Sequence, residues 1–196
     1  MDCEQRDDAQ IVCLSSEEAT DCVRDPERGL ELLREALETC VARNEHRPRS
    51  SAFIAISLDN MQSITDLFGA PVAEPVFGGL VGRLKECVRT SDVIARLGGA
   101  QLGIVLPHFR FNGASVVLKR VLALRSKPIS TNFGAIDVKL SVASVLFPDG
   151  NLSAADIITR AQATLSFNQN RRDEPLQLTD SVRMRLKVVR SDALTA

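Results

Sequence analysis

The sequence predicts an α+β fold in which helices pack on a mostly antiparallel central sheet. The run Ala52 to Leu58 is nearly continuously apolar and has the length of a central strand. Two more apolar runs flank the pair Gly98-Gly99, as in a tight hairpin. Residues 136–142 alternate between apolar and polar side chains. With the helical patterns between them, these segments give the order β-α-α-β-β-α-β-α-β, which fits a sandwich of helices on a sheet.

The first predicted helix begins at Asp25-Pro26, after an acidic segment 1–24 that is expected to be mobile. Aspartate is a frequent N-cap, and proline is favoured at the first helical position. Apolar residues then follow at helical spacing: Leu30, Leu33, Ala36, Leu37, Cys40 and Val41.

Three further helices are predicted between and after the strands. Asp59-Asn60 is expected to cap a short helix that ends at Phe68-Gly69, and a longer helix is expected to start near Pro75. Another amphipathic pattern spans 114–122.

The C-terminal part of the domain begins with a helix start signal. Ser153 and Asp156 form a capping box ahead of a helix, and 176–178 is predicted to be a last short strand.

Composition limits the classes of protein to which the chain can belong. The 196 residues suit one domain with tails, and the formal net charge of −1 favours neither nucleic acid nor an anionic membrane as a partner. The five cysteines are odd in number and lack metal-ligand spacing, as in a reduced cytoplasmic protein. No segment reaches the roughly 18 apolar residues of a membrane span, and the acidic N-terminus is unlike a signal peptide.

A short motif precedes the two glycines of the predicted hairpin. Arg89-Thr90-Ser91-Asp92 forms an RxxD motif with five residues between it and Gly98, and the turn itself reads GGAQL. At this point the chain resembles the GGDEF family of diguanylate cyclases, which join two GTP molecules into cyclic di-GMP. The resemblance covers residues 25–180, including a DPERGL segment similar to the DxLTGLxNR opening of that family. It implies the GGDEF/nucleotidyl-cyclase-like sandwich.

The same resemblance implies that the catalytic chemistry is missing. Cyclisation of GTP needs Mg²⁺ held by carboxylates, which screens the charge of the triphosphate. The strand-end and turn positions that the family uses for metal are here Ser57, Asp59, Ala100 and Gln101. Thr65 and Glu74 occupy its two guanine-reading positions, and Gln169 replaces a phosphate-binding lysine. Serine, alanine and glutamine replace the metal-binding acids at positions 57, 100 and 101, so no metal, no cofactor and no cyclase activity is expected.

Two readings of the remaining active-site residues stay open. Asp59 is interpreted as a helix cap in preference to a metal ligand, because an aspartate before a helix start usually caps it. Gly98 and Gly99 still allow a phosphate to approach the backbone, which leaves GTP binding as an alternative.

The RxxD set is retained. In family members with product inhibition, this arginine and aspartate bind cyclic di-GMP together with a second arginine, which corresponds to Arg120 here. Arginine can pair with guanine or grip a phosphate, and aspartate can accept from the N–H edge of guanine. The alternative is a surface ion pair of Arg89 and Asp92, worth about 0–1 kcal/mol, with Arg120 solvated.

The segment 181–196 carries basic residues around an apolar face and resembles the helix that connects a GGDEF domain to an EAL phosphodiesterase domain. Either the chain is part of a longer protein, or this helix serves dimerisation or docking. The leading hypothesis is therefore a catalytically inactive GGDEF-like regulatory domain that binds cyclic di-GMP and signals through a homodimer or a partner domain. The alternatives are a ligand-free interaction scaffold and a GTP-binding regulator of an EAL domain.

Overall fold

The computed structural model describes residues 25–46, 50–109, 113–132, 134–147 and 152–170. The α-helices in these ranges are α2 (Pro26–His46), α3 (Met61–Phe68), α4 (Ala70–Cys87), α5 (Gly113–Ala123) and α6 (Ala154–Asn170). The strands are β1 (Ser50–Leu58), β2 (Val93–Gly98), β3 (Gln101–Phe109), β4 (Ile129–Thr131), β5 (Gly134–Ile136) and β6 (Leu140–Phe147). A short 3-10 helix, η1 (Leu124–Ser126), follows α5.

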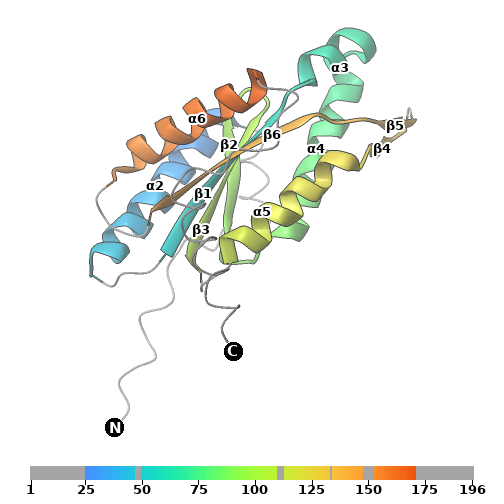
Figure 1. Cartoon of the computed structure of the whole chain (residues 1–196). Coiled ribbons are helices and arrows are strands. Elements are labelled where there is room, and N and C mark those ends of the chain that lie inside the picture. Colours follow the sequence, from blue (N-terminus) through green and yellow to red (C-terminus); the bar gives the residue numbers. More distant parts are fainter. Residues whose placement is uncertain (1–24, 47–49, 110–112, 133, 148–151, 171–196) are drawn as a thin grey trace, which may run out of the picture.

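Four strands form the central sheet in the order β2-β3-β1-β6 (Figure 1). Every neighbouring pair is antiparallel, and β2 and β3 are the arms of the hairpin predicted around Gly98-Gly99. The predicted α+β class with an antiparallel sheet is confirmed.

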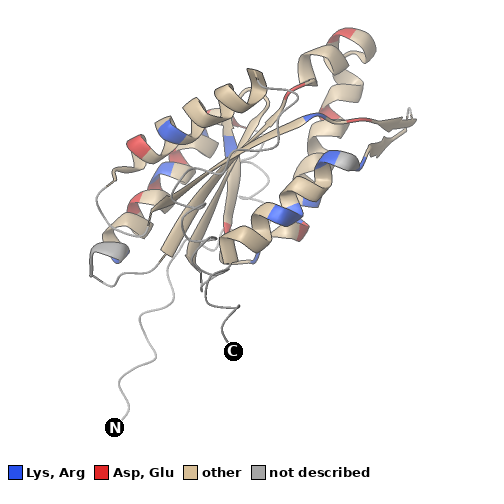
Figure 2. Ribbon diagram, in the orientation of Figure 1, with Lys and Arg blue, Asp and Glu red and all other residues tan. Residues whose placement is uncertain are grey.

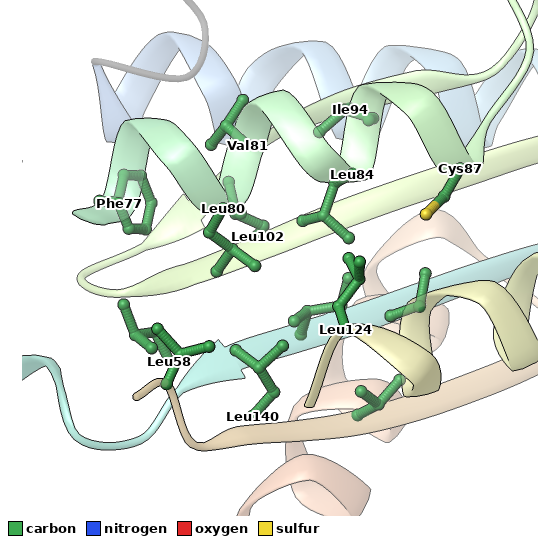
Figure 3. Close-up of a cluster of buried hydrophobic side chains, with 14 of the residues drawn as sticks. Leu58, Phe77, Leu80, Val81, Leu84, Cys87, Ile94, Leu102, Leu124 and Leu140 are labelled. Carbon is green, nitrogen blue, oxygen red and sulfur yellow. The ribbon is translucent and has the colours of Figure 1, made fainter. Parts of the chain in front are cut away.

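Both faces of the sheet are covered by helices. Phe53 and Ala55 of β1 lie in a core with residues of α2 and α6, whereas Ile54 and Ile56 lie in a second core with α4 and α5. Successive side chains of a strand point to opposite faces, so a central strand between two helical layers is apolar at almost every position. Figure 3 shows the second core, in which Leu80, Leu84 and Cys87 follow each other along α4 and Leu102 of β3 lies beside Leu80.

One close approach fixes how α2 sits on the sheet. A Cβ atom at Gly103 would lie 2.6 Å from Leu33 Cδ1 and 2.9 Å from Phe53 Cε2. Leu33 and Phe53 are both fully buried. The missing side chain of Gly103 is therefore the space into which these two side chains pack.

The predicted caps are present at two helix starts. Asp25 Oδ1 accepts the backbone N–H of Glu27 at 2.9 Å, with Pro26 as the first residue of α2. At α6, Ser153 Oγ accepts the N–H of Asp156 at 3.1 Å, and Asp156 Oδ2 accepts the N–H of Ser153 at 3.3 Å. This reciprocal pair is the predicted capping box.

The predicted start of the long helix near Pro75 is wrong. The helix α4 begins at Ala70, with Pro71 in its first turn and Pro75 inside it. Gly69 ends α3 and precedes α4 with φ of 78°, so one glycine separates the two helices. Pro75 has no backbone N–H to donate to the carbonyl of Pro71, so the helix continues through this position without that hydrogen bond.

The single strand predicted over 136–142 is also wrong. Its first residue ends β5, which pairs with the unpredicted β4 in a separate two-stranded sheet, and its last three residues begin β6. The intervening backbone is held by the side chain of Asn60, two residues after β1: Asn60 Nδ2 donates to the Asp137 carbonyl and Asn60 Oδ1 accepts from the Lys139 N–H. Alternation of side chains continues through such a break, so the pattern alone did not reveal it.

Three predictions fall outside the described residues: the mobile segment 1–24, the short strand 176–178 and the basic helix 181–196. In the part of the chain that the structure describes, no helix is long and apolar enough to cross a membrane.

Candidate functional site

A row of polar residues crosses the sheet where the family's metal site would lie. Ser57 on β1 pairs with Gln101 on β3 and with Ser141 on β6. Directly opposed residues on neighbouring strands share a face, so these three side chains lie on one side of the sheet. That side is covered by α2 and α6, as the burial of Phe53 and Ala55 in the same core indicates.

The end of α6 is joined to this row of polar residues by a hydrogen-bond network. Gln169 Nε2 donates to Ser57 Oγ at 2.7 Å and to Asp59 Oδ1 at 2.9 Å. Ser141 Oγ donates to Asp59 Oδ2 at 2.6 Å. The Asp59 carboxylate thus accepts hydrogen bonds from an amide and from a hydroxyl group, so each of its oxygens is bonded to a neutral donor.

The interpretation of Asp59 as a helix cap is wrong. The N-cap of α3 is Asn60, which makes no side-chain cap hydrogen bond, and the Asp59 carboxylate faces Ser141 and Gln169 instead. The Asp59 backbone N–H donates to the Lys139 carbonyl at 2.8 Å, which holds this residue on the sheet. Asp59 therefore follows directly after β1, and its carboxylate bridges Ser141 of β6 and Gln169 of α6.

Thr65 and Glu74 stand apart from this network. The Thr65 hydroxyl donates to the Met61 carbonyl within α3 at 2.9 Å, and Glu74 is exposed on α4. Among the described residues, the structure therefore gathers Ser57, Asp59 and Gln169 but leaves the two predicted guanine-reading positions outside the network.

The two-glycine turn is held by Arg96, a residue that the sequence analysis did not select. Gly98 and Gly99 have φ values of 144° and 50°, which favour glycine. Arg96 Nε donates to the Gly99 carbonyl at 2.7 Å, and its guanidinium lies 4.6 Å from the centre of the Phe77 ring. A lone arginine inside the apolar run 93–97 was the available signal, because such a charge needs a partner.

The RxxD motif forms a compact turn at the end of α4. Asp92 Oδ2 accepts the backbone N–H of Arg89 at 2.8 Å, and the Asp92 N–H donates to the Arg89 carbonyl at 3.0 Å. Burial raises the pKa of Asp92, and the hydrogen bond from the Arg89 backbone and the Arg89 charge oppose that rise. Asp92 thus fixes the backbone from which the exposed Arg89 side chain extends.

Arg120 lies in the last turn of α5 and is exposed. Its charge acts to lower the pKa of the Cys87 thiol, although burial has the larger effect and raises that pKa. Arg89 follows Cys87 by two residues, which limits their Cα separation to about 7 Å. The structure therefore brings the three predicted ligand-binding residues, Arg89, Asp92 and Arg120, to one end of α4.

The network around Asp59 and the group formed by Arg89, Asp92 and Arg120 differ in charge. Among the described residues, no cluster of three or more His, Cys, Asp or Glu side chains could hold a metal ion. Lysine and arginine positions recur along α5, and the last turn of α4 carries Lys85 beside Glu86 (Figure 2). An anion is therefore the kind of ligand that suits the second group.

Comparisons with known proteins agree with this architecture. The family model described as diguanylate cyclase, GGDEF domain, matches residues 30–174. The diguanylate cyclase DgcP of Pseudomonas aeruginosa is 29% identical over 146 residues, which are 72% of this chain and 22% of that protein.

Two solved structures show the same fold. The GGDEF domain of TpbB (YfiN) from Pseudomonas aeruginosa superposes with a TM-score of 0.67 at 19% identity, over 72% of this chain and 83% of that one. The GGDEF domain of DgcB from Caulobacter crescentus, solved in complex with c-di-GMP, gives a TM-score of 0.62 at 15% identity, over 70% and 84%. The chain spans between 11% and 28% of the length of the first curated relatives that it matches.

Proposed function

The chain belongs to the GGDEF domain family of diguanylate cyclases, and from that premise we propose that it is a catalytically inactive member that binds cyclic di-GMP as a regulatory domain. The observation that carries the proposal is the contrast between its two groups of polar residues. Neutral side chains replace the metal-binding acids at positions 57, 100 and 101, while Arg89, Asp92 and Arg120 gather at one end of α4.

The inactivity follows from the ligand chemistry of Mg²⁺. This cation prefers several carboxylate or phosphate oxygens in octahedral geometry. The catalytic positions offer one carboxylate, that of Asp59, and both of its oxygens already accept hydrogen bonds from Gln169 and Ser141. Without the metal, nothing at this site would screen the charge of two triphosphates as they approach one another.

The binding half of the proposal follows from charge and geometry. Cyclic di-GMP is a dianion with two guanine bases, and a guanidinium can pair with either a phosphate or the O6/N7 edge of guanine. Asp92 Oδ2 accepts the Arg89 N–H and Oδ1 accepts the Ser91 hydroxyl at 3.4 Å, and each carboxylate oxygen keeps a second lone pair, so Asp92 can still receive the N–H edge of a base. Asp92 would therefore both shape the turn and read the base.

Isothermal titration of the purified chain with cyclic di-GMP tests the proposal. We expect a dissociation constant in the micromolar range, about −8 kcal/mol at the 1 M standard state. The Arg89→Ala variant should lose at least about tenfold in affinity, because a charge-assisted contact is worth about 1.5–3 kcal/mol. The Arg34→Ala variant is the matched control, since Arg34 is also exposed but lies on α2.

The same titration addresses the other functions. Turnover of GTP with Mg²⁺ or Mn²⁺ would contradict the proposed inactivity. Heat from GTP without turnover would favour a GTP-binding regulator of an EAL domain. No heat from cyclic di-GMP would reject the receptor role. That result would favour an interaction scaffold, for which the exposed Leu67 and Phe68 of α3 are the supporting observation.

A further inference from the structure

We propose that Lys127 is an additional ligand-binding residue of the cyclic di-GMP site, placing its ammonium group against a phosphate of the bound dinucleotide. The inference rests on the proposed function and extends it to a residue outside the RxxD set. Its basis is the way in which the segment after η1 is fastened to α4.

Arg83 of α4 fixes the backbone at Lys127. Its Nη1 donates to the Lys127 carbonyl at 2.7 Å, and its Nη2 donates to the Pro128 carbonyl at 2.6 Å. The Lys127 N–H donates in turn to the Leu124 carbonyl at 3.1 Å. The planar guanidinium fork holds two successive carbonyl groups, so this backbone has little freedom although the Lys127 side chain is exposed.

The next turn of α4 holds the same segment by packing. Ile129 is buried, and its Cγ2 lies 2.7 Å from the point where a Cβ of Gly79 would be. Gly79, Arg83 and Cys87 follow each other at intervals of four residues, so they form one row along α4. The chain from Ile129 back to Lys127 follows this row in the direction of Cys87.

The charged groups near Cys87 agree with this course of the chain from Ile129 to Lys127. Arg120 and Lys127 both act to lower the pKa of the Cys87 thiol, whereas burial, which has the largest effect, and the Glu86 charge raise it. Figure 3 shows Cys87 at the end of α4 with its sulfur directed toward the core. Arg89 follows two residues later.

Lys127 therefore joins Arg89 and Arg120 around one end of α4, from a third element of the fold. Lysine is a compact, strongly hydrated point charge that suits a phosphate better than a guanine edge. The two arginines can therefore pair with guanine bases or phosphates, and Lys127 neutralises the charge of a phosphate. Arg83 is a positioning residue, because its Nη1 and Nη2 donate to the carbonyl groups of Lys127 and Pro128.

The experiment compares the Lys127→Gln and Arg34→Gln variants by titration with cyclic di-GMP. Both changes remove one exposed positive charge, but Arg34 lies on α2, which packs on the other face of the sheet from α4. We expect Lys127→Gln to weaken binding about tenfold, as for loss of one charge-assisted contact, and Arg34→Gln to change it less than about twofold. The loss should shrink at 1 M salt, where the Debye length falls to about 3 Å.

The Arg83→Gln variant provides a second measurement. It leaves the ammonium group in place but releases its backbone, so it should weaken binding by less than Lys127→Gln while the melting temperature confirms folding. Wild-type binding that Arg89→Ala abolishes and Lys127→Gln leaves unchanged would overturn the role of Lys127 alone. No binding by the wild type would overturn this inference together with the proposed function, and the two failures are thus distinguishable.

Discussion

Replacing Phe53 by alanine is expected to lower the free energy of unfolding by about 3–5 kcal/mol. Phe53 lies in the middle of β1, is fully buried, and packs beside Leu33 over the space that Gly103 leaves open. Its loss removes contacts to both the sheet and α2, and the neighbouring strands on either side prevent collapse of the cavity. Because domains of this size are stable by about 5–15 kcal/mol, the variant should be close to unfolding at 37 °C.

Urea denaturation followed by circular dichroism measures this change. The control is Phe68→Ala, which removes the same side chain from the end of α3, where it is 53% exposed. We expect the control to change the free energy of unfolding by less than about 1 kcal/mol. Equal midpoints for the two variants would contradict the central position of Phe53 in the core.

Gly103→Ala gives an independent check of the same packing. A methyl group at this position meets Leu33 and Phe53 at distances that force them to move, so the variant should lose about 1–3 kcal/mol. Shortening Phe53 to leucine in the same chain should recover part of that loss, since residues in contact do not act additively.

The sheet and its helices could be predicted because the apolar pattern there directly reflects burial. The run at β1 is continuous because both faces are covered, and the caps at Asp25 and Ser153 act within a few residues. The break between β5 and β6 could not be predicted in this way. It is imposed by Asn60, about 77 residues away in sequence, whose amide binds the Asp137 carbonyl.

The candidate site, like the fold, could be predicted only in part. The resemblance to a known family selected Ser57, Asp59 and Gln169, and the structure joins these three. It did not select Ser141, whose hydroxyl completes the network, because serine in an alternating strand carries no distinctive signal. Arg83 was missed for a similar reason: its partners are backbone carbonyl groups, which no sequence motif records.

Replacing Ser57 by aspartate is expected to destabilise the chain by about 2–4 kcal/mol at pH 7 in the absence of divalent cations. Ser57 is buried, and its hydroxyl oxygen accepts the same Gln169 amide that Asp59 does. A second carboxylate there would face the first with only one amide donor between them. Two like charges at this distance disfavour ionisation, so the pKa of the introduced carboxyl group should be raised in the folded state.

The sign of the pH dependence follows from that raised pKa. The folded variant binds a proton more readily than the unfolded chain does, so its stability deficit should shrink as the pH falls from 7 toward 5. Ser57→Asn is the matched control, because it has nearly the same volume but no charge, and its deficit should not vary with pH over this range.

Magnesium provides the decisive comparison. Two adjacent carboxylates are hard oxygen ligands for Mg²⁺, so millimolar Mg²⁺ should raise the melting temperature of Ser57→Asp relative to EDTA. The wild type and Ser57→Asn should show no such rise, since Asp59 is their single carboxylate in this network and its oxygens bond to Ser141 and Gln169. A magnesium-dependent rise in the wild type would mean that Asp59 binds the metal in spite of its neutral partners, and the proposed inactivity would then lose its physical basis.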